Sequence, residues 1–547
     1  MGTKVNSNYE SLLTFTRASK GHALRPVSYG DELVTNGTFD DSSALNDWEE
    51  FSGTLSVASQ KLRVTQTTGS NPSAGQTVNT TVGKIYVLSL DYFPDDANAQ
   101  ILVKSTNISG SILYNEQNLT SDGTYRNVFV ATKSSIYIQL VAQSSTTGHY
   151  AEFDNVSLKE VIFDQPDGTL TLFEHPDDVP RVEWDSAGNA LGLLVEEQRT
   201  NLVTYSEDFT VQAGRWTNGQ EGGASLTSGL TESPDRSDSV WKLYATSGTG
   251  TQLIQQNPTV SGATTVSASV YLKKAEYKYG GIRLLDSSQS AGYSVFIDLD
   301  DGSVFDTSTR GTPTVSDYSV QDVGNGWWRL SVITSSDGGE VNFTVAISDG
   351  TLINSFDVVS FVGDGTSGIY IYGAQVEAGS FPTSYMKNEG TSSGVTRSAD
   401  VASIPVADFG YNHSEGTVNV EIDPLTDTLV ANPMAYQLND GTTSERLTVF
   451  GSASSWRFVA TDGGVQQSSI TSGTFGTAKI ASSFEQNKFN HCVNGTLGTE
   501  DTSGTMPTIT ELGLGNQNGS NLLNGHIKSI KYYPRRLTNA QLQDLTS

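Results

Sequence analysis

Hydrophobic and polar residues alternate with a period of two in many short segments of the chain. In residues 135–142, Ile136, Ile138 and Leu140 alternate with Tyr137 and Gln139, and residues 265–272 and 416–423 show the same pattern. Successive side chains of a β-strand point to opposite faces, so this period predicts strands with one buried face. Strands of this length between Gly, Asn and Asp turns are typical of antiparallel sandwiches.

Two local signals refine this picture. Asp301-Gly302 lies between two apolar strands and predicts a hairpin turn. The surrounding stretch 298–303 could be taken for a calcium loop, but a glycine stands where a third ligand is expected. At the C-terminus, Thr538 and Gln541 form a capping-box pair before Leu542 and Leu545, which predicts one short helix.

The predicted fold class is all-β, with three tandem antiparallel β-sandwich (jelly-roll) domains and a short C-terminal helix. The openers of the first two sandwiches are alike, each with an Asn and a Phe followed by a Trp. The predicted parts are an N-terminal arm and first part of a connector (1–30), a carbohydrate-binding-like jelly roll (31–160), a connector (161–200), a second jelly roll (201–390) and a concanavalin A-like lectin or laminin G-like domain (391–547).

The composition and the net charge limit the classes of molecule that this protein can bind. The chain has 547 residues, 36% hydrophobic and 17% charged, with 54 glycines, which suits several globular domains rich in turns. A net charge of −28 is the wrong sign for nucleic acid or for an anionic membrane surface. The N-terminal sequence lacks the apolar core of a signal peptide, no run approaches a membrane span, and Cys492 is the only cysteine. We therefore expect synthesis in a cytoplasm, no membrane insertion and no disulfide.

No catalytic residue is predicted. Glu196 and Glu197 are adjacent, and neighbours on a strand point to opposite faces, so this pair cannot form the facing carboxylates that a glycosidase needs. An ion pair of one of them with Arg199 is the simpler interpretation. The six histidines are scattered, and no nucleophile elbow or phosphate-binding loop is present.

Two kinds of binding site are predicted. An exposed indole can stack on a sugar ring, although each tryptophan could instead fill a core. Because Trp327 and Trp328 are adjacent, one of them should be buried while the other can be exposed. Asp40 and Asp154 could hold a structural Ca²⁺ ion, although strand-end aspartates look the same in sequence. The candidate ligand-binding residues are Trp48, Trp216, Trp327, Trp328 and Trp456.

Several blocks, in order along the chain, resemble bacteriophage tail fibre and virion appendage proteins. The first sandwich resembles a family 4/22-type carbohydrate-binding module and interrupts a connector that is normally continuous, so it is interpreted as an insertion. The last domain is similar to the concanavalin A-like (laminin G-like) lectin domains of these proteins. The blocks are LTFTRAS (13–19), VPRVEWDSAGNALGLLVEEQRTNLVTYSEDF (179–209), VGNGWWRLSV (323–332), IYIYGAQVEAGSFPTSYM (369–386), GVTRSADVASI (394–404) and, in the last domain, EGTVNVEIDPL (415–425) and NGHIKSIKYYPRRLTNAQLQDL (524–545).

The resemblance implies a non-enzymatic protein at the surface of the virion. It would be a tail or head fibre-like appendage that contacts other phage virion proteins and adheres to host cell-surface polysaccharide. A homo-oligomer, most simply a trimer, would strengthen weak sugar contacts by avidity. Two alternatives stay open: a capsid or tail decoration protein whose lectin-like folds make protein contacts, and a polysaccharide depolymerase with converging carboxylates.

Overall fold

The computed structural model describes residues 12–40, 42–218, 224–228, 231–237, 239–262, 264–353, 359–426 and 432–547. The chain divides into two compact units, residues 26–169 and residues 1–25 with 170–547. The module predicted for residues 31–160 lies inside the first of these units. The parts predicted as 201–390 and 391–547 both belong to the second unit, and the predicted arm is described only from residue 12.

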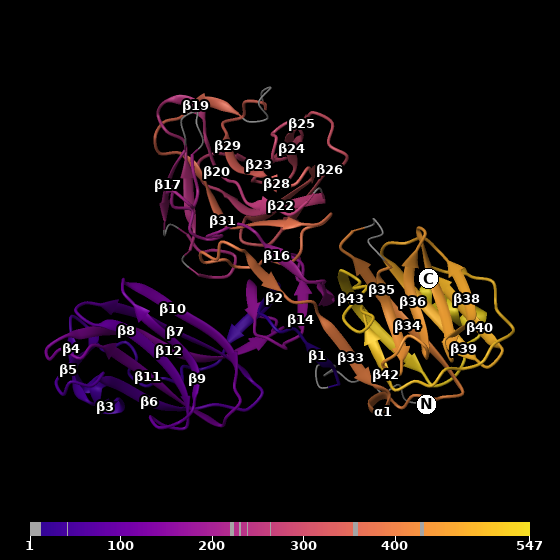
Figure 1. The fold of residues 1–547 in the computed structure, drawn as a ribbon, viewed down its shortest axis with the longest axis horizontal. Coiled ribbons are helices and arrows are strands. Elements are labelled where there is room, and N and C mark those ends of the chain that lie inside the picture. The colour runs from indigo at the N-terminus through magenta and orange to yellow at the C-terminus, as the bar shows by residue number, and fades with distance from the viewer. Residues whose placement is uncertain are drawn as a thin grey trace. The chain divides into compact units, whose positions relative to one another are not determined.

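The unit of residues 26–169 is a β-sandwich, drawn in indigo and purple in Figure 1. Its core contains apolar residues of both sheets, among them Leu88, Ile101, Ile138 and Phe153. One sheet has the order β10 (Gly123–Val130), β7 (Ile85–Pro94) and β12 (Tyr150–Phe163), with β5 (Lys61–Gln66) on β12 and β4 (Gly53–Ala58) on β5. The end of β12 also pairs with residues 27–29 of β2 (Gly21–Tyr29). The other part of β2, residues 21–25, and residues 170–175 of its partner strand β13 (Thr169–His175) belong to the second unit. The other sheet of the sandwich has the order β3 (Glu49–Phe51), β6 (Ser73–Asn79), β11 (Ser135–Gln143), β8 (Asn98–Ser105) and β9 (Ile112–Leu119), and the 3-10 helix η2 (Ser42–Asp47) precedes β3.

The second unit contains two further sandwiches. The one formed by the middle of the chain has a core that includes Trp216, Val270, Ile282 and Phe343. One of its sheets has the order β17 (Ser225–Ser228), β18 (Trp241–Tyr244), β31 (Gly368–Ala378), β22 (Thr264–Lys274), β27 (Trp327–Ser336) and β26 (Ser316–Asp322). The other has the order β20 (Leu253–Gln256), β29 (Asn342–Ser348), β23 (Tyr279–Leu285), β24 (Gly292–Asp298) and β25 (Val304–Arg310). Two-stranded pairs are β16 (Arg199–Asn201) with β32 (Val395–Arg397), β19 (Thr249–Thr251) with β30 (Ser360–Val362), and β21 (Thr259–Val260) with β28 (Gly339–Glu340).

The C-terminal sandwich takes three strands from earlier parts of the chain: β1 forms the edge of one sheet, and β14 and β15 extend the other. The predicted connector is therefore partly strand. One sheet has the order β1 (Thr14–Thr16), β33 (Val401–Pro405), β42 (Glu511–Leu514), β35 (Met434–Asn439), β36 (Arg446–Ser452), β37 (Ser455–Asp462) and β38 (Val465–Ser472). The other has the order β14 (Arg181–Trp184), β15 (Ala190–Val195), β43 (Gly525–Tyr533), β34 (Glu415–Pro424), β39 (Ala478–Glu485), β40 (Lys488–Val493) and β41 (Thr496–Leu497), and the helices are α1 (Val406–Phe409) and α2 (Asn539–Thr546).

The all-β prediction is confirmed, and so are its local signals. The Asp301-Gly302 turn joins antiparallel β24 and β25, and Thr538 and Gln541 form the capping box of α2. One expectation was wrong: β11 and β22 are buried on both faces rather than one. On β22 the polar face is covered within its own unit, where Ser267 donates to the carbonyl of Phe381 and Ser269 accepts from Arg329. No helix among the described residues is long and apolar enough to cross a bilayer.

Candidate functional site

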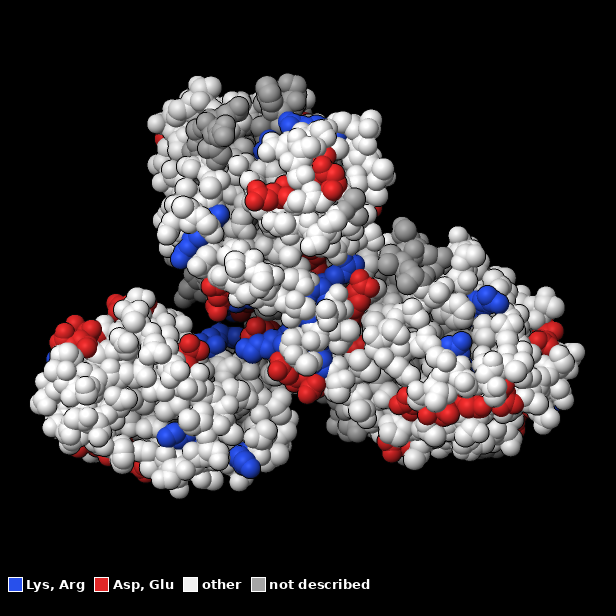
Figure 2. Space-filling view, in the orientation of Figure 1, with Lys and Arg blue, Asp and Glu red and all other residues white. Residues whose placement is uncertain are grey.

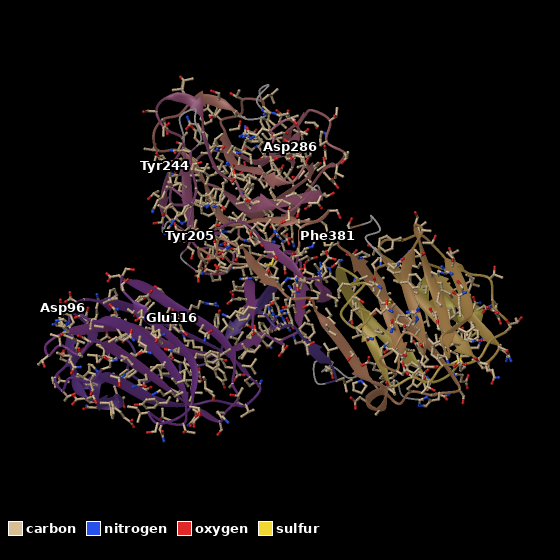
Figure 3. The ribbon with its side chains drawn as sticks, in the orientation of Figure 1. Asp96, Glu116, Tyr205, Tyr244, Asp286 and Phe381 are labelled. Atoms are coloured by element: carbon tan, nitrogen blue, oxygen red, sulfur yellow. The ribbon has the colours of Figure 1, made fainter. Side chains whose placement is uncertain are left out.

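The side of the β3-β6-β11-β8-β9 sheet that points away from the core is the best candidate for a binding surface. Ile136, Ile138 and Leu140 of β11 lie in the core, so Tyr137 and Gln139 point to the other side of the sheet. Strand register places Glu49, Gly75, Gln139, Leu102 and Asn115 in one row across the five strands. This surface is called the outer face below, and Figure 3 labels Glu116 on its edge strand β9.

Tyr137 lies along the outer face because Gly75 leaves room for it. A Cβ atom at Gly75 would lie 1.9 Å from the Tyr137 hydroxyl oxygen. The hydroxyl donates to Glu49 across the width of β6, at 3.1 Å. Burial and the neighbouring Glu49 carboxylate both raise the pKa of Tyr137, so the phenol stays protonated and remains a donor.

Gln139 supplies an unpaired acceptor beside that ring. Its side chain is 6% exposed, and its Nε2 donates to Ser73 Oγ at 2.8 Å. Its Oε1 is buried and has no hydrogen-bond partner among the described residues. A buried polar atom without a partner costs free energy. A hydroxyl donor from a ligand would recover that cost, but it reaches Oε1 only when the Gln139 amide turns outward, because the atom is covered in this structure.

Phe51 provides an exposed aromatic surface of the kind that the sequence analysis predicts for tryptophans. It lies opposite Ser73 on β3, on the same side of the sheet, and half of its side chain is exposed. Beside β6 there is a hollow of about 390 Å³ lined by residues that include Asp47, Thr77 and Asn79. The alternation of residues 135–142 was the sequence signal for this surface; Phe51 had none, because its strand has only three residues.

The tryptophans are placed differently from the ligand-binding prediction. Trp216, Trp327 and Trp456 are fully buried and Trp48 is 5% exposed, so these rings fill cores, because the indole is among the largest apolar surfaces available to them. Each has a backbone carbonyl for its indole N–H, such as Tyr205 O for Trp216 at 3.2 Å. Trp328 is only partly buried, but it packs against the core and donates to Leu299 O. The expected difference between Trp327 and Trp328 is present, yet neither presents an open ring face comparable to Phe51.

Asp40 and Asp154, the two residues predicted to hold a calcium ion, are close enough for the charge of Asp40 to act on Asp154. Burial raises the pKa of Asp154, and the charges of Asp91 and Asp40 raise it further. However, within the described ranges no group of three Asp, Glu, His or Cys side chains is arranged to hold a metal ion. Ca²⁺ normally takes six to eight oxygen ligands, so these two carboxylates alone do not make a calcium centre.

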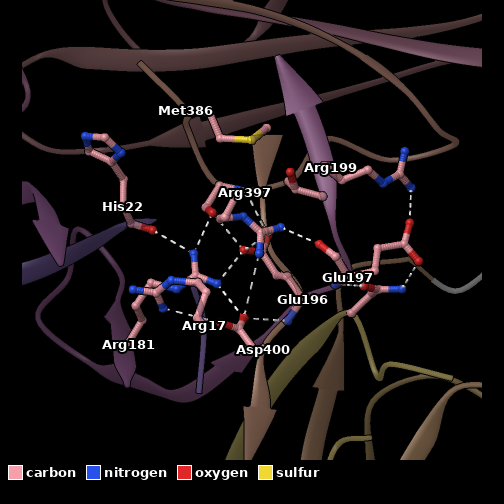
Figure 4. Close-up of polar contacts among 12 residues, drawn as sticks. Arg17, His22, Arg181, Glu196, Glu197, Arg199, Met386, Arg397 and Asp400 are labelled. Atoms are coloured by element: carbon pink, nitrogen blue, oxygen red, sulfur yellow. Dashed lines mark hydrogen bonds and ion pairs between the residues drawn. The ribbon is translucent and has the colours of Figure 1, made fainter. Parts of the chain in front are cut away.

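Glu196 lies in a buried cluster of charged residues that joins distant parts of the second unit (Figure 4). Its carboxylate accepts from the backbone N–H and the hydroxyl of Ser384 at 2.8 and 2.7 Å, and pairs with Arg181 at 2.8 Å and Arg397 at 3.4 Å. Asp400 pairs with Arg181 at 2.6 Å. Burial alone would raise the pKa of Glu196, but Arg397, Arg181 and the hydrogen bonds from Ser384 lower it to about 2.

Arg17 completes this cluster, which we call the buried charge cluster (Arg17, Arg181, Glu196, Arg397 and Asp400). Three guanidinium groups face two carboxylates, and the excess positive charge of Arg17 is stabilised by carbonyl oxygens, including Ser19 O at 2.8 Å and Pro176 O at 2.8 Å. Glu197 points elsewhere and pairs with Arg199 at 2.5 Å, as predicted. The cluster is sealed from solvent and serves to join segments rather than to bind a ligand.

Comparison with known proteins gives no family. No protein-family model matches the chain, and no curated protein matches it. Similar solved structures include one titled "CBM4 structure and function" (18% identity, 23% of this chain, 97% of that chain, TM-score 0.20). Two others are the CBM22-1–CBM22-2 tandem of Paenibacillus barcinonensis Xyn10C (12%, 64% and 97%, TM-score 0.21) and mouse laminin alpha1 domains LG4-5 (9%, 66% and 94%, TM-score 0.19). At these scores none of the likenesses assigns a function to this chain.

Proposed function

We propose that this protein is a non-enzymatic structural protein of a bacteriophage virion, a tail or head fibre-like appendage that adheres to host cell-surface polysaccharide. The observation that carries the binding part is the outer face of the inserted sandwich. Exposed Phe51 can stack on the apolar face of a sugar, while Gln139 Oε1 and the Asn115 row offer partners for hydroxyl groups. The virion part is supported by the resemblance of the sequence blocks.

A homo-oligomer, most simply a trimer at the surface of the particle, accompanies this proposal. A single polar sheet face binds a sugar weakly, and several copies on one particle would raise the effective affinity without any new contact. Contacts with other virion proteins would then fix the copies in register.

A second function is favoured by one specific observation. The rings of Trp216, Trp327 and Trp456 are fully buried, so among the described residues the tryptophans do not form a wide aromatic platform. A decoration protein of the capsid or tail, which uses its sandwiches for protein contacts, needs no such platform.

The position of the protein on the virion and its binding to glycans together distinguish an adhesin from a decoration protein. Cryo-EM of purified virions, with copy number and symmetry, should place the protein on a projecting fibre or at the distal tail if it is an adhesin. The recombinant chain should also bind purified capsular or lipopolysaccharide glycans of the host. Many copies embedded on the shell or tube, without glycan binding, would replace adhesion by decoration.

A further inference from the structure

A second polar cleft lies in the middle sandwich, beside β20. It has a volume of about 550 Å³, within the range of about 300–1,000 Å³ that is usual for small-molecule sites. Tyr205, whose ring lies under the lining residue Arg215, is labelled in Figure 3. We call it the β20 cleft, and the lining residues that matter here are Thr204, Arg215, Gln255, Asn257, Ser392 and Ser393.

Asn342 fixes the orientation of two amide side chains in this cleft. Its Nδ2 donates to Gln255 Oε1 at 3.2 Å and to Asn257 Oδ1 at 3.0 Å. Its own Oδ1 accepts from Arg283 at 3.0 Å and from Thr344 at 3.0 Å, so the Asn342 amide cannot be reversed without losing these bonds. Both acceptor oxygens are therefore occupied, and Gln255 and Asn257 offer their NH₂ groups. Neither NH₂ group has a hydrogen-bond partner in the described part of the chain.

The walls of the cleft are held in place before any ligand arrives. The amide of Gln256 bonds to both the N–H and the carbonyl of Thr204, each at 2.7 Å, which ties the start of the sandwich to β20. Thr217 also bridges to Gln255 through the backbone. A site whose groups are already ordered loses less entropy when it binds.

The cleft carries no uncompensated charge. Arg215 is the one ionisable residue of its lining; it forms an ion pair with Asp208 and lies 4.0 Å above the Tyr205 ring. The remaining polar groups of the lining are amides and hydroxyls. Most of the surface drawn in Figure 2 is likewise neither acidic nor basic.

We infer that the β20 cleft binds a neutral, hydroxyl-rich ligand, a short oligosaccharide segment without carboxylate or sulfate groups. The inference rests on the proposed glycan adhesion and adds a second contact site, in another sandwich and independent of the outer face. Sugar hydroxyl and ring oxygens accept from the Gln255 and Asn257 NH₂ groups, and the Ser392 and Ser393 hydroxyls complete the contacts.

The test uses the whole chain and defined trisaccharides. Isothermal titration with maltotriose, cellotriose and chitotriose, and with trigalacturonate as an acidic counterpart, should show binding of at least one neutral sugar and weaker binding of the acidic one. Hydrogen exchange should slow in peptides that cover residues 253–261. Preference for trigalacturonate, or no binding of any neutral sugar, would overturn the inference.

An isosteric variant locates the binding. Asn257→Asp keeps an oxygen for Asn342 but replaces the NH₂ donor, so affinity for the neutral sugar should fall at least tenfold. The matched control is Asn325→Asp, the same exchange in an exposed turn between β26 and β27, which should change affinity less than twofold. If Asn257→Asp binds like the parent chain while a substitution at Gln139 abolishes binding, the β20 cleft is excluded and the proposed adhesion through the outer face stands.

Discussion

The buried charge cluster and the outer face of the inserted sandwich both contain buried polar side chains, but they differ in how these groups are partnered. In the cluster every carboxylate oxygen of Glu196 and Asp400 accepts from a guanidinium, a hydroxyl or a backbone N–H. On the outer face Gln139 Oε1 has no partner within the part that the structure describes, and Phe51 is half exposed.

This difference separates residues that hold the fold from residues that are free to bind. Removing one member of a closed, buried network leaves the others uncompensated and destabilises the protein. Removing an atom that has no partner changes the stability little, because no intramolecular bond is lost. Stability and binding measurements should therefore respond to opposite sets of substitutions.

The largest loss of stability is expected for Asp400→Asn in the buried charge cluster. It leaves Arg17 and Arg181 buried without their shared carboxylate, and the free energy of unfolding should fall by about 3–5 kcal/mol. Guanidinium titration of the whole chain, following the transition of the second unit, measures it. As a control, Lys528→Ala removes an exposed ion pair with Glu421 and should cost less than about 1 kcal/mol. Equal losses in the two variants would contradict a closed cluster.

A pH dependence should follow from Glu196. Its pKa is about 2 in the folded chain against 4.5 in the unfolded one, so its stabilisation is present above pH 4.5 and is lost as the pH falls toward 2. The expected loss is about 3 kcal/mol, at 1.36 kcal/mol per pKa unit. Urea unfolding of the parent chain and of Glu196→Gln between pH 6 and pH 2 should give a steeper decline for the parent. Parallel profiles would show that Glu196 is not held ionised by Arg397 and Arg181.

The cluster also shows what the sequence could and could not predict. An ion pair of Arg199 with one of the two adjacent glutamates followed from local spacing, and the strands and α2 followed from periodicity and capping. The partners of Glu196 lie far from it in sequence, such as Arg397 and Ser384, and no periodicity reports such contacts. Burial of the tryptophans was equally undecidable, because an indole in a core strand and one on a binding face occupy the same sequence pattern.

On the outer face, substitutions should affect binding more than stability. Gln139→Met removes the unpaired Oε1 at similar volume but also removes the Nε2 donor to Ser73, so we expect about tenfold weaker binding of the proposed host polysaccharide and a loss of about 1 kcal/mol in unfolding free energy. Gln165→Met, the same exchange at an exposed position after β12, should alter neither. A large loss of stability in Gln139→Met, with binding intact, would move Gln139 to the structural side of the comparison.

Gly75→Ala tests whether the outer face needs the space that Gly75 leaves for the Tyr137 side chain. The added Cβ would overlap the Tyr137 hydroxyl, so the ring must leave the sheet surface and its bond to Glu49. We expect a destabilisation of about 1–3 kcal/mol, as for other overpacked sites. Tyr137→Ala in the Gly75→Ala background removes the overlap, whereas Tyr137→Phe keeps a ring carbon 2.2 Å from the added Cβ, so stability should recover in the first double variant and not in the second. Equal stability of the two double variants would show that the Tyr137 ring does not meet the added Cβ.

The carboxylates around Asp154 are a third case, in which the charges of Asp91 and Asp40 act on Asp154 and Lys61 opposes them. With only two predicted ligands, and no third acidic group beside them among the described residues, any Ca²⁺ held here would bind no more tightly than about 1 mM, the weak end of calcium modules. At 5 mM Ca²⁺ such a site would raise the unfolding free energy of the inserted sandwich by about 1 kcal/mol. Calorimetry in Ca²⁺ and in EDTA, with Asp154→Asn as the control that should remove the difference, measures this smallest effect.

Because Asp91 and Asp40 both raise the pKa of Asp154, the same substitution should stabilise the sandwich slightly in EDTA. A calcium effect that survives Asp154→Asn would place the ion elsewhere and leave these carboxylates as ordinary surface charges.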